Sequence, residues 1–175
     1  MAILKKISIA ALAGVVMTAG AYAADPVTNY GNEVTPAYTA AGFDWNGFYV
    51  GLNNAYVNTG GAEWGIGGVA GINIQDGAMV YGAELEANAL VAGGVVTGGL
   101  YEATARAGYL VSDDVLVYGV GGGGYDTGVG VGLVGAGMEF ALTQEVTLGA
   151  EYNYLFNSGG TVGHEIDGKI RWYFN

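Results

Sequence analysis

Hydrophobic and polar residues alternate along most of the chain after residue 45, in eight blocks that are each about ten residues long. In the block from 79 to 89, the odd positions are apolar or aromatic, whereas Glu84 and Glu86 stand at even positions. Successive side chains of a strand point to opposite faces, so this period of two predicts a strand with one apolar face. Turn signals such as Asp76-Gly77 separate the blocks. The pattern therefore predicts an all-β protein.

The basic residues indicate which face of the strands is the inner one. Arg106, Lys169 and Arg171 all lie on the less apolar face of their blocks. A membrane barrel tolerates charge only at inward positions or in loops, because its outward residues contact hydrocarbon. A soluble sandwich or lipocalin-like barrel also alternates, but its outward face is polar. We therefore predict a closed antiparallel eight-stranded transmembrane β-barrel with an up-and-down meander, in which closure satisfies every backbone group.

The block around Val120 has an ambiguous register, because most of its positions are glycine. We expect Leu116, Tyr118 and Val120 to face outward. Glycines on the inward face would then make room for the long arginine and glutamate side chains opposite them.

The first 23 residues have the features of a signal peptide. Lys5 and Lys6 precede an apolar stretch that ends near Gly20, and Ala21-Tyr22-Ala23 fits the cleavage rule. The apolar run is shorter than the roughly 20 residues of a membrane-spanning helix. We therefore predict export through the Sec pathway, a flexible periplasmic segment at 24–44, and an outer-membrane barrel at 45–175.

Composition limits the possible partners. Cleavage would remove two lysines, leaving three basic residues against 16 acidic ones and a formal net charge of −13. Such a chain is a poor match for nucleic acid, whose phosphates require clustered Lys and Arg. The chain has no cysteine and therefore no disulfides. We also expect no catalytic residue, no metal ligand and no cofactor.

Large aromatic residues are predicted to form two girdles, as expected where a barrel meets the two membrane interfaces. Alternating strand directions place Phe48, Tyr81, Tyr109, Tyr118, Phe140, Trp172 and Phe174 at one rim, and Tyr56, Trp64, Tyr101, Tyr154 and Phe156 at the other.

The lumen is predicted to hold a charged side-chain network. Its three bases are Arg106, Lys169 and Arg171, and its acids are Glu84, Glu86, Glu102, Glu139, Glu151, Glu165 and Asp167. An unpaired buried ion costs several kcal/mol, so these groups must be paired or hydrated. We expect Arg106 to pair with Glu84 or Glu86 on the preceding strand, and Lys169 and Arg171 to pair with Glu151 across the last hairpin.

Three segments carry a resemblance to a known family. The run from Asp44 to Gly51, DWNGFYVG, resembles the opening strand of small opacity-type, OmpA-like outer-membrane β-barrel proteins of Gram-negative bacteria. Residues 131–154, with GAGMEFAL and AEYNY, are similar to the sixth and seventh strands of that family. The resemblance implies insertion in the outer-membrane lipid with the help of periplasmic chaperones and the barrel-assembly machinery. It also implies a structural or surface-interaction role.

The chain departs from this family at two points. Family members usually end on an aromatic residue, whereas Asn175 follows Phe174 here. The expected loops, such as 58–63 and 157–161, are also short. Short loops argue against an adhesin or receptor role.

Catalytic interpretations of the sequence are weak. His164 and Ser158 lie six residues apart in no recognised motif. Glu84 and Glu86 share a face, but Arg106 makes a structural network the better interpretation. Two functions remain open. The first is a structural, envelope-integrity role with a plugged lumen, and the second is a small porin-like channel for ions or small solutes. An eight-stranded lumen holds little more than its own side chains, which favours the first.

Overall fold

The structure is a computed structural model that describes residues 42–160 and 162–174. Its strands are β1 (Gly47–Asn58), β2 (Ala62–Asp76), β3 (Met79–Ala92), β4 (Val95–Ser112), β5 (Val115–Asp126), β6 (Val129–Ala141), β7 (Val146–Phe156) and β8 (Val162–Phe174). The predicted signal peptide and most of the predicted segment 24–44 lie outside the described residues. Among the described residues, no helix is long and apolar enough to cross a membrane.

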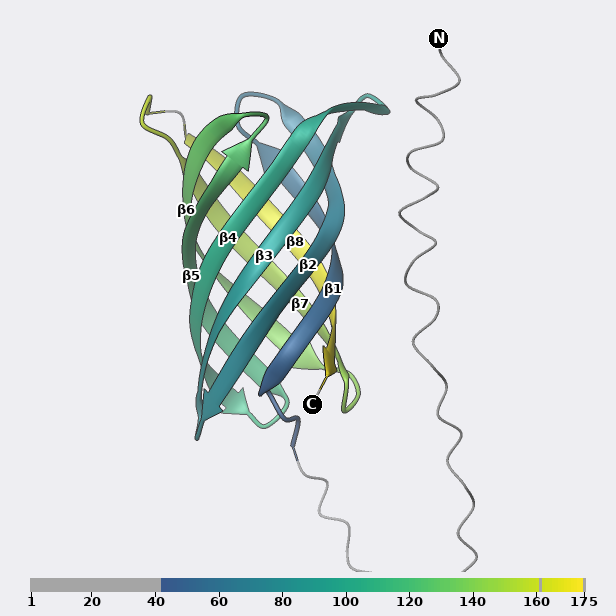
Figure 1. The fold of residues 1–175 in the computed structure, drawn as a ribbon, viewed down its shortest axis with the longest axis vertical. Helices are drawn as coiled ribbons and strands as arrows, with labels where there is room; N and C mark the ends of the chain where they lie inside the picture. The colour runs from purple at the N-terminus through teal and green to yellow at the C-terminus, as the bar shows by residue number, and fades with distance from the viewer. Residues whose placement is uncertain (1–41, 161, 175) are drawn as a thin grey trace, which may run out of the picture. The chain divides into compact units, whose positions relative to one another are not determined.

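The eight strands form one closed barrel (Figure 1). Each strand pairs antiparallel with the next, and β1 also pairs with β8 through a register that runs from Phe48↔Phe174 to Asn58↔His164. The predicted fold class is confirmed. The predicted turn at Asp76-Gly77 joins β2 to β3, and Gly77 adopts a φ of +58°, which glycine tolerates best.

The two ends of the barrel carry different connections. The end at which β1 begins and β8 ends holds the β2–β3, β4–β5 and β6–β7 turns, and we call it the turn end. The opposite end holds the β1–β2, β3–β4, β5–β6 and β7–β8 connections, and we call it the loop end (Figure 1).

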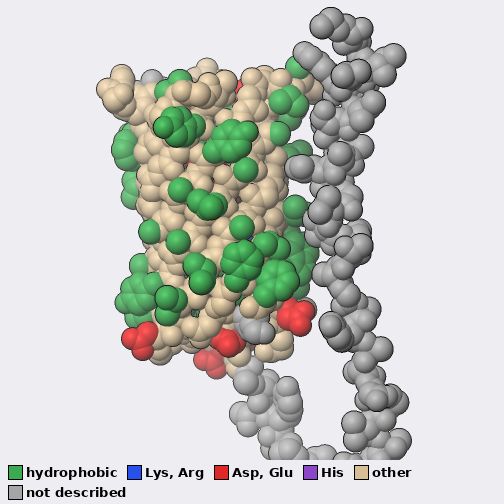
Figure 2. Space-filling view, viewed as in Figure 1, with side chains coloured by type: hydrophobic (Ala, Val, Ile, Leu, Met, Phe, Trp, Pro, Cys, Tyr) green, Lys and Arg blue, Asp and Glu red, His purple; other side chains and the backbone are tan. Residues whose placement is uncertain are grey.

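The outer face of the barrel is apolar and the lumen is charged. Ile66 and Leu85 are 62% and 64% exposed, whereas the side chains of Glu139 and Arg171 are fully buried. Figure 2 shows hydrophobic side chains over the barrel wall and acidic side chains gathered at one end. Exposed apolar surface on this scale is unfavourable in water and is the expected boundary with lipid.

Large aromatic side chains lie outward near both ends of the barrel (Figure 2). At the turn end, the rings of Phe48 and Phe174 lie 6.3 Å apart, and at the loop end the rings of Tyr56 and Trp64 lie 5.3 Å apart. Further outward aromatic residues of the predicted girdles are Tyr81, Tyr101, Tyr109, Phe140, Tyr154, Phe156 and Trp172. Tyr125 is also exposed on the outer face and was not predicted there.

The predicted outward register of β5 is wrong. Leu116, Tyr118 and Val120 are buried inside the barrel, at 0%, 3% and 6% exposure. The prediction of Tyr118 as a girdle residue therefore fails. Outward positions of β5 are largely glycine, so alternation gave no clear indication of its direction. Tyr118 lies inward because its hydroxyl donates to Glu151 (2.8 Å).

Candidate functional site

The lumen is filled by the inward side chains of all eight strands. Along β8 the inward residues run from Glu165 near the loop end, through Asp167 and Lys169, to Arg171 and Tyr173 near the turn end. All five are buried. This single strand shows the order of the lumen, in which Glu102, Glu165 and Asp167 lie nearer the loop end, and the two arginines, with Glu84 and Glu139, lie nearer the turn end.

An aromatic cap closes the turn end. Trp45 is fully buried, its indole Nε1 donates to the Asp113 carbonyl (3.0 Å), and its ring lies 6.2 Å from that of Tyr173. The ring of Phe43 lies 4.7 Å from that of Trp45 and 5.0 Å from that of Tyr173. Phe43 falls within the predicted flexible segment, so the last residues of that segment are part of the barrel instead. The sequence pattern does not indicate the cap, although Trp45 is the second residue of the DWNGFYVG segment.

Two arginines and two glutamates lie next to this cap. Arg106 forms an ion pair with Glu139 (2.8 Å), and Arg171 forms ion pairs with Glu139 (3.1 Å) and Glu84 (2.8 Å). The four side chains come from β3, β4, β6 and β8. A buried charge is costly unless it is paired. Each guanidinium is paired with carboxylates that reach across the lumen from non-adjacent strands.

Lys169 lies at the centre of a second cluster. Its Nζ is 2.8 Å from Glu86, 3.0 Å from Glu84 and 3.2 Å from Glu151. Glu84 thereby links the two clusters, since it also contacts Arg171. One ammonium group thus faces three carboxylates, an arrangement that concentrates negative charge in the middle of the lumen.

The expected pairing of the network is partly wrong. Arg106 contacts Glu139 and not its expected partners Glu84 and Glu86, which contact Lys169 instead. The expected contact between Lys169 and Glu151 is present, whereas Arg171 contacts Glu84 and Glu139. The expectation used cross-strand neighbours alone. In so narrow a barrel, a long side chain reaches the opposite wall as readily as the next strand.

Neutral side chains complete the coordination of the paired carboxylates. Tyr49 donates to Glu84 (2.7 Å), Tyr173 donates to Glu139 (3.0 Å), and Thr147 also donates to Glu139. Arg106 lies over the rings of Tyr49 and Tyr118, with its guanidinium carbon 5.0 and 5.1 Å from the ring centroids. These contacts pair the buried charges and supply most of their hydrogen bonds, whereas the Nη1 and Nη2 atoms of Arg171 make ion pairs without a hydrogen bond.

The part of the lumen nearer the loop end is acidic and lacks such partners. Glu102, Glu165 and Asp167 are at most 6% exposed, and among the described residues none of them forms an ion pair. One amide, that of Asn153, donates to Glu165 (3.2 Å) and Asp167 (3.4 Å). One carboxylate oxygen of each of the three acids has no hydrogen-bond partner in the described part of the chain.

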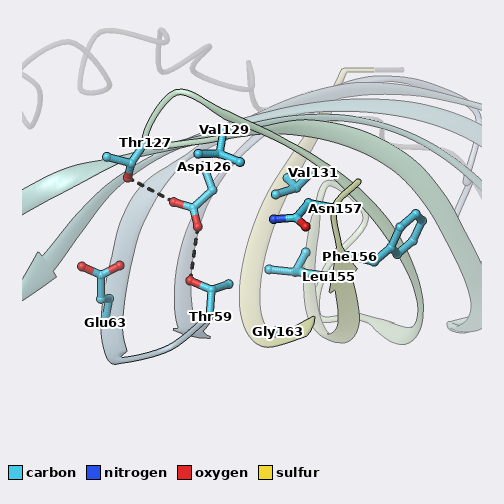
Figure 3. A pocket seen from close by; sticks show the side chains of 10 residues that line it. All are labelled: Thr59, Glu63, Asp126, Thr127, Val129, Val131, Leu155, Phe156, Asn157 and Gly163. Carbon is cyan, nitrogen blue, oxygen red and sulfur yellow. Dashed lines mark hydrogen bonds between the residues drawn. The ribbon is translucent and has the colours of Figure 1, made fainter. Parts of the chain in front are cut away.

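Apolar side chains and a shallow cavity lie beyond this acidic region. Val57, Leu90, Leu100 and Leu155 are buried on the inward faces of their strands near the loop end. Above them lies a cavity of about 400 Å³ that includes Thr59, Glu63, Asp126 and Thr127 in its lining (Figure 3). Asp126 accepts hydrogen bonds from Thr59 (3.3 Å) and Thr127 (3.1 Å), as Figure 3 shows.

His164 and Ser158, the weak catalytic candidates, do not form a catalytic site with each other. His164 lies on the outer face, where its Nδ1 is 2.7 Å from the Tyr152 hydroxyl and its ring lies 5.7 Å from that of Tyr154. Ser158 belongs to the β7–β8 connection. His164 therefore acts as a partner for aromatic residues of the outer surface.

The architecture matches that of solved membrane barrels. Ail, the attachment invasion locus protein of Yersinia pestis, aligns with a TM-score of 0.50 and 17% sequence identity, over 73% of this chain and 97% of Ail. The chain has the fold of the small eight-stranded outer-membrane barrels. No protein-family model matches the sequence, and no curated protein matches it either.

Two further solved structures align over similar lengths. Neisserial surface protein A shows 19% identity and a TM-score of 0.48, over 73% of this chain and 97% of that protein. The N-terminal β-barrel domain of Pseudomonas aeruginosa OprF shows 10% identity and a TM-score of 0.47, over 73% of this chain and 98% of that domain.

Proposed function

We propose that the protein is an integral outer-membrane barrel with a structural, envelope-integrity role and a lumen closed by its own side chains. The observation that carries this proposal is the cross-lumen ion-pair network of Arg106, Lys169 and Arg171 with Glu84, Glu86, Glu139 and Glu151. It joins β3, β4, β6, β7 and β8 through the centre of the barrel. Such a network ties opposite walls together and fills the space that a solute would need.

Both ends of the lumen support closure. Trp45, Tyr49 and Tyr173 fill the turn end, and Val57, Leu100 and Leu155 lie below the loop-end cavity. A continuous water path would have to pass both apolar layers and the network between them. An eight-stranded barrel is only wide enough for side chains to fill its interior, which agrees with this arrangement.

Outer-membrane location is part of the same proposal. The apolar outer face, the aromatic residues near both ends and the closed antiparallel sheet support a lipid environment in which only barrels and helices satisfy their backbone groups. Outer-membrane lipid is the main partner in this proposal, and the barrel-assembly machinery and periplasmic chaperones would act only during biogenesis. Export would use the Sec pathway.

Two experiments test location and closure separately. Heat-modifiable gel mobility of the membrane fraction, combined with proteolysis of whole cells, is expected to show a folded barrel with cleavage limited to loop-end connections. In planar bilayers, the refolded protein is expected to give no stable, reproducible openings. Such openings would replace the structural role with that of a small channel for ions or small solutes.

A further inference from the structure

Negative charge is in excess inside the barrel. Seven carboxylates are buried in the lumen, namely Glu84, Glu86, Glu102, Glu139, Glu151, Glu165 and Asp167. Among the described residues, three cationic side chains share the lumen with them. Each forms an ion pair with Glu84, Glu86, Glu139 or Glu151. By formal charge the carboxylates exceed the cations by four (7 − 3) among the described residues, and the acids without an ion pair there are Glu102, Glu165 and Asp167.

Two of these acids, Glu102 and Glu165, converge with Glu86, which also forms an ion pair with Lys169 (2.8 Å). Glu86, Glu102 and Glu165 each place one carboxylate oxygen within 4.8 Å of the others. Ca²⁺ binds oxygen ligands at about 2.4 Å, so ligand oxygens around one ion lie no more than about 4.8 Å apart. Glu86 and Glu102 are cross-strand neighbours on β3 and β4, and Glu165 comes from β8, which pairs with neither strand. Their separation fits a single ion between them.

A second observation points to a ligand at this place. Glu102 is 6% exposed, is directed into the cluster, and has an Oε1 atom with no hydrogen-bond partner in the described part of the chain. The Oδ1 atoms of Asn53 and Asn153 are likewise buried and without a partner. The amide nitrogens of these two side chains already donate to Glu86 and Glu165. Neutral amide oxygens are thus present beside the carboxylates, and both are ligand types that Ca²⁺ uses.

We infer that Glu86, Glu102 and Glu165 form a site for one Ca²⁺ ion in the loop-end half of the lumen. A hard divalent cation suits a set made only of oxygen atoms, and Ca²⁺ accepts flexible geometry, whereas Mg²⁺ requires near-ideal octahedral geometry and retains several waters.

This inference goes beyond the structural role, and its test has a different readout. The refolded mature protein in detergent is freed of metal with a chelator and then titrated with Ca²⁺ in equilibrium dialysis. The expected result is one Ca²⁺ per chain and a higher unfolding temperature when the ion is bound. Mg²⁺ or Na⁺ at the same concentration is expected not to displace it.

Glu102→Gln is the decisive variant, because it removes charge from the site without removing a partner of any lumen cation. We expect it to lower Ca²⁺ affinity by about tenfold or more and to abolish the stabilisation by Ca²⁺. Glu145→Gln is the matched control, since Glu145 is an exposed glutamate in the β6–β7 turn. It is expected to bind Ca²⁺ as the wild type does.

Several results would overturn the calcium site. Wild-type protein that binds no Ca²⁺ saturably would mean that the acids hold protons or water instead. Unchanged affinity in Glu102→Gln would place the ion elsewhere, and displacement by equal Na⁺ would remove the divalent assignment. If Glu102→Gln does not fold, Glu165→Gln and the wild-type melting curve with and without Ca²⁺ decide the question. Channel openings in bilayers would contradict the proposed closed lumen. They would not contradict the calcium site, which the number of Ca²⁺ ions bound per chain tests separately.

Discussion

The two halves of the lumen treat buried charge in opposite ways. Near the turn end, Glu84 and Glu139 each contact two cationic side chains and also accept hydrogen bonds from tyrosines. Near the loop end, Glu102 and Asp167 contact no cationic side chain among the described residues. The carboxylates near the turn end are paired and stabilise the barrel. Those near the loop end lack a cationic partner in the described part of the chain, and a buried group without a partner suggests a bound proton, water or ion.

Inward residues of one strand can lie in both halves of the lumen. Glu102 and Arg106 are both inward residues of β4, separated by Thr104. Arg106 pairs with Glu139, whereas Glu102, nearer the loop end, has no ion-pair partner among the described residues. The proposed calcium site therefore lies on the loop-end side of the ion-pair network and shares Glu86 with it.

The largest expected effect is loss of the acid that neutralises both arginines. Glu139→Gln leaves the buried Arg106 and Arg171 with less negative charge nearby. Removal of one partner from a buried ion pair costs about 3–5 kcal/mol. Reversible denaturant unfolding in lipid vesicles should show a drop of this size in the free energy of unfolding. A drop below about 1 kcal/mol would mean that the ion pairs near the turn end do not stabilise the barrel.

Arg106→Met is expected to have a smaller effect of the same sign. Glu139 loses one cation but keeps Arg171, Tyr173 and Thr147, so the cost is about 1–3 kcal/mol. The measurement is the temperature at which the folded band on a gel converts to the unfolded one. An unchanged conversion temperature would contradict the ion pair between Arg106 and Glu139.

Glu102→Gln should change stability in the opposite direction when no metal is present. Its carboxylate is buried beside other acids and has no cationic partner in the described residues. Loss of that charge is expected to raise the free energy of unfolding in chelator by about 1 kcal/mol. The same vesicle unfolding experiment measures it beside Glu139→Gln. A decrease for both variants would remove the distinction between the two halves.

The smallest effect tests the inward register of β5. Tyr118→Phe loses the hydrogen bond to Glu151 and should cost about 1 kcal/mol. Tyr109→Phe is the matched control, because Tyr109 is exposed on the outer face, and it should change stability little. Equal effects of the two substitutions would favour the outward position that the sequence pattern indicated for Tyr118.

Periodicity predicts the fold because one face of each strand is strongly marked. Acids in β3, and both acids and bases in β8, alternate with apolar residues, so the inward face of each strand can be read directly. In β5, glycine occupies most positions after Val120, and the only charged residue of the strand, Asp126, stands at its end, so alternation marks the inner face weakly. Leu116 and Tyr118 then resemble lipid-facing residues although they fill the lumen.

The ion pairs were less predictable than the inward set of charges. A period of two gives the face of Arg106 but not its partner, because contacts across the lumen depend on strand tilt and barrel diameter. The aromatic cap was also hard to predict from the sequence. Trp45 precedes β1 and Phe43 lies in a segment without alternation, so only their burial in the folded barrel reveals their role.

Quenching of tryptophan fluorescence by brominated lipid tests the central claim, which is that apolar side chains face lipid while the lumen is sealed from it. The chain has three tryptophans, and Trp64 is 54% exposed on the outer wall, whereas Trp45 is fully buried in the turn-end cap. Single-tryptophan variants that keep only one of these two residues are refolded into brominated vesicles. We predict strong quenching of Trp64 and little quenching of Trp45. Equal quenching of both, or stronger quenching of Trp45, would contradict the proposed sidedness of the barrel.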